Sequence, residues 1–132
     1  MRPVADACHI AVPVRDLDEA VSFYVDGLGV KLARRYDDRV TFDFFGDQLV
    51  CHLSPDLTQE AALYPRHFGV SFADPADFDR LVRLVEFRGL RVLHEESVRF
   101  EGTAERHRTI FLADPSNNVL EFKNYDDPRL QY

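Results

Sequence analysis

Three side chains of the kind that bind metal ions stand in apolar segments of the sequence: His9 in CHIAVPV, His67 in HFGVSF and Glu121 in VLEFKNY. The glutamate is the most informative, because burying an unpaired charge costs several kcal/mol. A carboxylate in an apolar strand is therefore exposed, paired with a cation or bound to a metal. Imidazole nitrogens and a carboxylate together are donors that borderline divalent ions such as Fe(II), Mn, Co, Ni and Zn accept. His52, in QLVCHL, is a fourth candidate.

The segments that carry these residues belong to an internal repeat of about sixty residues. Alternating apolar residues and turn signals predict the order strand, helix, strand, strand, strand in each copy. The strands predicted in the first copy are 8–14, 30–36, 40–45 and 48–53, and those in the second are 67–72, 91–98, 107–112 and 119–125. The first helix is expected to begin at Asp16 and end at Gly29, and the second to begin at Asp74-Pro75 and end at Gly89.

We interpret residues 1–132 as one α+β domain made of two modules. The first module covers about 7–54 and the second about 67–125. Between them lies a connector, about 55–66, with a helix-compatible LTQEAALY between two prolines, and a tail, 126–132, follows the second module.

The two copies can be superposed residue by residue. The superposition places His9 on His67, Gly29 on Gly89, Thr41-Phe42 on Thr109-Ile110, and Val50-Cys51-His52 on Val119-Leu120-Glu121. If each first crossover is right-handed, the first and last strands of a module lie side by side. One concave surface then collects His9, His52, His67 and Glu121, with the small side chains of Ala11, Pro13, Gly69 and Ser71 leaving room for a ligand.

Composition and charge limit the classes of molecule that the protein can bind. The chain has 132 residues, 45% of them hydrophobic, and a formal charge of −7 without a basic stripe, which argues against nucleic acid and anionic membranes. The partner is therefore expected to be a small molecule or another protein. Neither an apolar run of about 20 residues nor an export signal is present, so we expect a cytoplasmic protein. Cys8 and Cys51 are expected to be buried packing residues, free of disulfides in a reducing compartment.

The order of elements, the opening HIAVPVRDLDEAVSFYVDGLGVKL and the closing FLADPSNNVLEF resemble the vicinal oxygen chelate superfamily. Its members include glyoxalase I, bleomycin-resistance proteins, extradiol dioxygenases, methylmalonyl-CoA epimerase and fosfomycin-thiol transferases. The resemblance covers nearly the whole chain and implies two βαβββ modules, a curved mixed sheet that forms a cup, and helices outside it.

The resemblance also implies a set of site residues. Superfamily ligand positions carry over onto His9, His67 and Glu121, while His52 stands at a fourth position where the superfamily has Glu, Gln or no ligand. His52 is either a ligand or a polar residue of the pocket that donates to one. Lys123 and Tyr125 share the face of Glu121, so with that glutamate they are candidates for catalysis; a solvated lysine and a packing tyrosine are the alternative. His94 and His107 have no repeat partner and are expected at the surface or the pocket rim.

Two functions from different classes follow. The first is a divalent-metal-dependent lyase, isomerase or dioxygenase whose substrate chelates the ion through adjacent oxygens. The second is a metal-free protein that binds or sequesters a small molecule, as bleomycin-resistance proteins do. By resemblance we expect a homodimer, and the modules can share a site within one chain or exchange with a partner.

Overall fold

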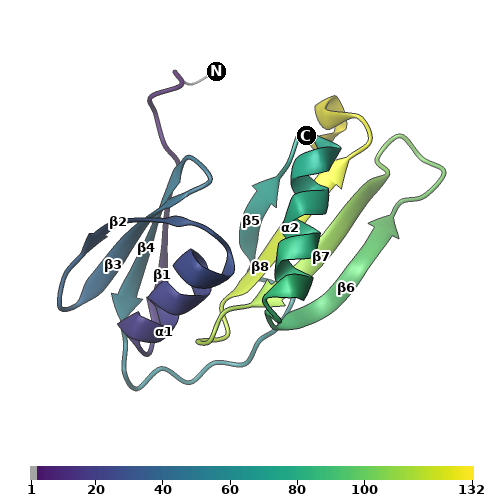
Figure 1. The fold of residues 1–132 in the computed structure, drawn as a ribbon. Coiled ribbons are helices and arrows are strands. Elements are labelled where there is room, and N and C mark those ends of the chain that lie inside the picture. Colours follow the sequence, from purple (N-terminus) through teal and green to yellow (C-terminus); the bar gives the residue numbers. More distant parts are fainter. Residues whose placement is uncertain (1–2) are drawn as a thin grey trace. The chain divides into compact units, whose positions relative to one another are not determined.

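The structure is a computed structural model that describes residues 3–132. Residues 1 and 2, the first residues of the N-terminal segment in which no export signal is expected, lie outside the described residues. The chain forms two compact units, one ending at Gln59 and the other running from Glu60 to Tyr132 (Figure 1). Each unit contains strand, helix, strand, strand, strand, so the α+β class and the repeat are confirmed.

The first unit is an open four-stranded mixed sheet. Its elements are β1 (His9–Val14), α1 (Leu17–Val21), η1 (Ser22–Gly27), β2 (Lys31–Arg35), β3 (Arg39–Phe44) and β4 (Asp47–Leu53). The strand order is β1-β4-β3-β2, with β1 parallel to β4 and the other neighbours antiparallel. The first and last strands of the module therefore lie side by side, as expected.

The helix of the first unit begins where the sequence predicts. The Asp16 side chain accepts a hydrogen bond from the Glu19 backbone N–H at 2.8 Å, which satisfies an unpaired donor of the first turn. The helix widens into a π-helix at η1, a change that the sequence did not indicate, and the chain reverses at Gly29, whose φ is +75°. Tyr24, fully buried, packs its ring against Phe42 of β3 at 5.2 Å.

The second unit repeats this layout. Its elements are β5 (Phe68–Ser71), α2 (Pro75–Phe87), β6 (Val92–Arg99), β7 (His107–Ala113), β8 (Val119–Tyr125) and η2 (Pro128–Gln131). The order is β5-β8-β7-β6, with β5 parallel to β8 and the rest antiparallel. The connector forms no helix despite its helix-compatible residues, whereas the tail forms the short 3-10 helix η2.

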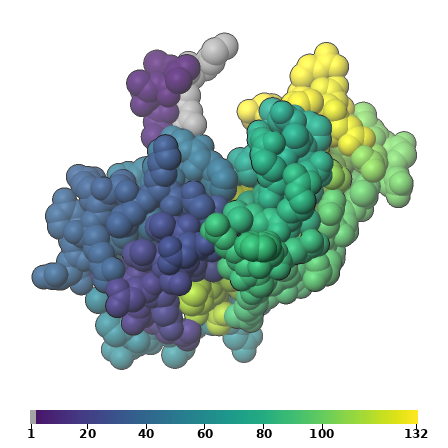
Figure 2. Space-filling view, in the orientation of Figure 1, coloured from purple at the N-terminus to yellow at the C-terminus, as the bar shows by residue number. Residues whose placement is uncertain are grey.

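α2 decides which face of the second sheet can hold a site. Asp74 caps it by accepting from the Ala76 backbone N–H, and Pro75 occupies the first turn. Its buried stripe packs with apolar residues of one sheet face: Phe78, Leu81, Val85, Ile110, Leu112, Leu120 and Phe122. Asn124, the one buried polar residue of β8 on that face, donates to the Phe72 carbonyl oxygen at 2.9 Å. The outer side of α2 is exposed, as the green surface of residues 75–87 shows in Figure 2. Glu121 lies on the opposite face of β8, away from this packing against α2.

Strand pairing corrects the predicted superposition of the two modules. Val50 pairs with Ala11, and Glu121 pairs with Gly69, and both partners lie two residues after the histidine of their module. Val50, and not His52, is therefore the counterpart of Glu121. The same shift makes Thr41, which pairs with Val50, the counterpart of Phe111, which pairs with Glu121. A slip of two residues keeps every side chain on its face, so alternation in the sequence could not reveal it.

Two packing expectations were wrong. Cys51 is buried as predicted, but Cys8 is exposed because it precedes the first residue of β1. His94 is exposed, as expected, whereas His107 is only 5% exposed. The imidazole of His107 packs on the Tyr125 ring, with the centroids 4.4 Å apart, so it belongs to the packed end of the sheet.

Candidate metal centre

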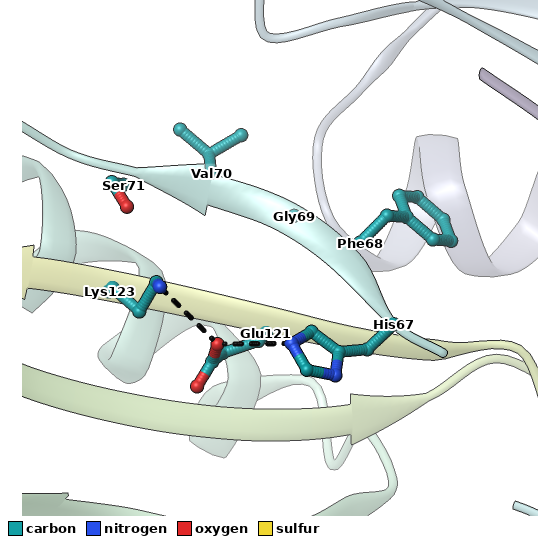
Figure 3. Close-up of a pocket in the computed structure, with 7 residues that line it drawn as sticks. All are labelled: His67, Phe68, Gly69, Val70, Ser71, Glu121 and Lys123. Carbon is teal, nitrogen blue, oxygen red and sulfur yellow. Dashed lines mark ion pairs between the residues drawn. The ribbon is translucent and has the colours of Figure 1, made fainter. Parts of the chain in front are cut away.

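The face of the second sheet that carries Glu121 contains a hollow of about 280 Å³. Residues of β5, of β8 and the residue just before β5 line it: His67, Phe68, Gly69, Val70, Ser71, Glu121 and Lys123 (Figure 3). β5 and β8 are parallel neighbours, so side chains from two segments far apart in the sequence meet on one surface. His67 and Glu121, two of the predicted ligands, both face this hollow.

Glu121 is the charged centre of the hollow, and its side chain is only 8% exposed. The Thr109 hydroxyl of β7 donates a hydrogen bond to its Oε2 at 2.7 Å. The other oxygen, Oε1, lies 3.4 Å from His67 Nε2 and 3.7 Å from Lys123 Nζ. The hydrogen bond from Thr109 thus holds the carboxylate through Oε2, while Oε1 faces Nε2 of His67. A carboxylate that binds a metal needs to be held in this way.

The imidazole of His67 is oriented by the connector. Its Nδ1 lies 2.7 Å from the Leu63 carbonyl oxygen, which can only accept, so Nδ1 carries a proton. Nε2 therefore points toward Glu121 Oε1, as Figure 3 shows. In a neutral imidazole this nitrogen presents a lone pair to a carboxylate oxygen. Two acceptors at this distance need a cation, either a proton or a metal ion, between or beside them.

Aromatic rings and one glycine hold His67 and Glu121 close together. The rings of Tyr64 and Phe111 pack nearly perpendicular to the His67 ring, with centroid distances of 5.6 Å and 5.4 Å. A Cβ on Gly69 would lie 1.7 Å from the backbone oxygen of Glu121, so no other residue fits without moving β5 from β8. Gly69 thereby fixes the separation of the strands that carry His67 and Glu121.

The first unit prepares a histidine in a comparable way. His9 Nδ1 lies 2.6 Å from Gln48 Oε1, and because this oxygen accepts, the proton sits on Nδ1 and Nε2 is available as a ligand. The position that corresponds to Glu121 holds Val50, a buried apolar residue. His52 is exposed and lies opposite Arg39 across the strand pair, so the repeat no longer supports it as a ligand.

Lys123 and Tyr125 extend the hollow along β8. Lys123 Nζ donates to the Tyr125 hydroxyl at 3.5 Å, and the Lys123 side chain is 29% exposed. Both side chains share the face of Glu121, as predicted. The ammonium therefore lies within reach of the carboxylate and of a phenol that can accept or donate a proton.

The donor set fits a borderline divalent ion, although only two of the predicted ligands meet within one unit. Within residues 3–132, no three His, Cys, Asp or Glu side chains gather at one point. The second unit alone supplies an imidazole nitrogen and a carboxylate oxygen, both with their remaining atoms tied to protein groups. Such outer contacts orient ligands in metal sites. The sequence placed Gly69 on this face but did not reveal its spacing role, nor the roles of Thr109 and the Leu63 carbonyl, because these contacts exist only in the folded backbone.

The profile of the Glyoxalase/Bleomycin resistance protein/Dioxygenase superfamily matches residues 8–122. The chain belongs to this superfamily. A glyoxalase/bleomycin resistance protein/dioxygenase from Alicyclobacillus acidocaldarius is 58% identical, with 100% of both chains covered and a TM-score of 0.95. The resemblance inferred from the sequence is thus confirmed, and so is the βαβββ layout of each module.

Two further solved structures of the superfamily share the fold at low identity. The fosfomycin resistance protein FosX from Listeria monocytogenes is 18% identical, with 90% of this chain and 92% of that chain covered and a TM-score of 0.72. A lactoylglutathione lyase from Agrobacterium tumefaciens is 22% identical, with 93% and 96% covered and a TM-score of 0.69. Such likeness extends to the fold and leaves the reaction open. Within residues 3–132 no helix is long and apolar enough to cross a membrane.

Proposed function

We propose that the protein is a divalent-metal-dependent enzyme acting on a small substrate that chelates the ion through adjacent oxygens. One observation carries the proposal: His67 Nε2 faces Glu121 Oε1 at 3.4 Å while Nδ1 is committed to a carbonyl. A buried carboxylate beside an imidazole lone pair is an arrangement that a divalent cation stabilises. The resemblance to the vicinal oxygen chelate superfamily supports the same reading.

Each residue of the site has a proposed role. His67 and Glu121 hold the ion, and His9 is proposed as a further ligand through its Nε2. When bound, the ion polarises a chelated oxygen and stabilises developing negative charge on it. Thr109 keeps Glu121 from rotating away, Lys123 binds a substrate oxygen, and Tyr125 exchanges a proton with the substrate. We also propose a cytoplasmic homodimer, by analogy with small members of the superfamily.

A metal-free binding protein is the second candidate, and one observation favours it. Glu121 Oε1 is within 3.7 Å of Lys123 Nζ, and a protonated His67 would add a second positive charge beside it. These two groups can balance the carboxylate without an ion. In that case the hollow would bind a small molecule without a metal ion, and chelators would not change the affinity of the protein for that molecule.

Metal analysis of protein purified without an affinity tag separates the two candidates. We expect one divalent ion per chain and its loss in both His67→Ala and Glu121→Ala. The matched controls are His94→Ala and Glu101→Ala, which remove an exposed histidine and an exposed glutamate of the same unit. Wild-type protein that binds no Mn²⁺, Ni²⁺ or Zn²⁺ in calorimetry would contradict the enzyme proposal and favour the binding protein.

The reaction class is tested next on metal-loaded protein. A catechol, a thiol hemiacetal and an acyl-CoA represent the dioxygenase, lyase and isomerase classes. Turnover of the catechol only in the presence of oxygen identifies a dioxygenase, and turnover of either other substrate without oxygen identifies a lyase or an isomerase. Turnover that survives removal of the metal by EDTA would contradict the proposed role of the ion.

A further inference from the structure

Lys123 has a special place in the hollow beside Glu121. Of the seven residues that line the hollow, it is the only lysine or arginine. Its Nζ lies 3.7 Å from Glu121 Oε1, and this is its one ion pair among the residues that the structure describes. The contact with the Tyr125 hydroxyl, at 3.5 Å, involves a neutral group. Lys123 therefore depends on the proposed metal ligand for its counter-charge.

A bound ion would change that balance. A dication and an ammonium would then face the single carboxylate of Glu121, and no other lining residue is acidic. Positive charges so close together repel each other strongly in a partly buried site. The side chain of Lys123 is 29% exposed, so its ammonium can swing away from Glu121 and remain in the hollow. A metal-loaded hollow thus carries an excess of positive charge and lacks an anion.

Ser71 stands next to this ammonium. Strand pairing places Ser71 of β5 directly opposite Lys123 of β8. In Figure 3 the Ser71 oxygen points from β5 toward β8, where Lys123 lies. One ammonium and one hydroxyl provide donors for the two oxygens of a carboxylate. A phosphonate, with three oxygens and up to two charges, normally recruits several cationic donors, and the hollow offers one.

We propose that Lys123 and Ser71 form a carboxylate subsite, so that the substrate is a small organic acid whose carboxylate lies next to its metal-chelating oxygens. This inference rests on the proposed metal-dependent function and names its substrate class. The ion also couples to the acid: by displacing Lys123 from Glu121 it frees the ammonium for the carboxylate. Binding free energies are reciprocal, so the acid tightens metal binding by the same factor.

The test compares two chelators on the metal-loaded protein by calorimetry: catechol, and 2,3-dihydroxybenzoate, which adds a carboxylate beside the same pair of oxygens. The measured quantity is the ratio of the two dissociation constants in each variant, so that differences in intrinsic chelating strength cancel between variants. We expect Lys123→Met to reduce the preference for the acid about tenfold or more, and Ser71→Ala to reduce it less. The control is Lys31→Met, because Lys31 is the only other lysine of the chain and is exposed on β2.

A second measurement separates this inference from the proposed function. Metal affinity without an organic ligand is expected to stay the same or rise several-fold in Lys123→Met, because the variant removes a like charge beside the ion. If Lys123→Met keeps both its metal and its full preference for the acid, the carboxylate subsite is wrong and the metal site stands. If wild-type protein binds no metal, the proposed function fails and the subsite falls with it.

Discussion

The two units prepare a histidine in the same way but differ in what stands across from it. In both, Nδ1–H donates a hydrogen bond to an oxygen, which is Gln48 Oε1 for His9 and the Leu63 carbonyl oxygen for His67. Two residues further along the first strand, the neighbouring strand supplies Val50 in the first unit and Glu121 in the second. Both units therefore have the same strand pairing and the same histidine tautomer. A charged residue stands at the paired position only in the second unit, where it is Glu121.

The strands also approach each other differently at this point. Ala11 faces Val50 in the first unit, whereas Gly69 faces Glu121 in the second, with no room for a Cβ. The glycine leaves room for the Glu121 backbone at this point, and the Glu121 carboxylate lies 3.4 Å from His67. The second unit therefore pairs its histidine with a carboxylate where the first unit has an apolar residue, and the following variants test that difference.

The largest effect is expected from removing the charge itself. Glu121→Ala should weaken metal binding by about a hundredfold or more, because the change removes a ligand and not merely a residue that orients one. His52→Ala, at the position that the sequence alone matched to Glu121, should leave the affinity unchanged. Metal titration by calorimetry measures both. Equal losses in the two variants would mean that the strand register does not identify the ligand.

The next effect concerns the approach of β5 to β8. Gly69→Ala should lower the free energy of unfolding by about 1–3 kcal/mol, because the new Cβ collides with the backbone of Glu121 and cannot be relieved by a side-chain rotation. It should also weaken metal binding. The reverse change in the first unit, Ala11→Gly, should cost about 0.5–1 kcal/mol through chain entropy alone. Urea unfolding measures both, and a Gly69→Ala protein of normal stability and metal affinity would refute the spacing role.

A smaller effect is expected from the hydrogen bond to Glu121 Oε2. Thr109→Val keeps the shape of the buried side chain but removes the donor, so metal affinity should fall about 10–100-fold. Thr109→Ser retains the hydroxyl and should restore most of the affinity. In the first unit, Thr41→Val should have no effect on the metal. Rescue by serine distinguishes orientation of the carboxylate from a packing defect, which both substitutions would share.

The smallest effect belongs to the first unit. Gln48→Leu removes the acceptor for His9 Nδ1–H and should weaken metal binding about tenfold, because the ring is no longer oriented. The loss should be no larger, because His9 is exposed and water can accept the same hydrogen bond. Gln48→Glu retains an acceptor and should behave like the wild type. If the leucine variant binds metal with unchanged affinity, His9 either needs no orientation or is not a ligand.

Much of the fold was predictable because local signals agreed with it. Asp16 and Asp74 cap the helices as expected, Gly29 and Gly89 reverse the chain after them, and the alternation of apolar residues placed each strand within about two residues of its observed ends. The π-helix at Ser22–Gly27 could not be foreseen, since it differs from an α-helix only in which carbonyl each N–H selects.

The candidate site was predictable only in part. Glu121 and His67 were candidates from their residue types, because a carboxylate in an apolar strand is exposed, paired with a cation or bound to a metal, and imidazole binds the same ions. Thr109 and Gly69 were not, because neither is a ligand and their roles exist only across strand pairs. The proposed ligand His52 was chosen through a superposition shifted by two residues, a slip that leaves the pattern of faces unchanged.

By itself the sequence determined the superfamily, the duplicated order of elements and the face of β8 that carries Glu121, since periodicity and capping are properties of consecutive residues. The tertiary structure alone decided the register between β1 and β4 and between β5 and β8, and with it which side chains meet. That register depends on which backbone groups pair across strands distant in the sequence, and no local signal records it. Gly69 beside Glu121, and the Leu63 carbonyl beside His67, are the contacts that turn two separated residues into one candidate centre.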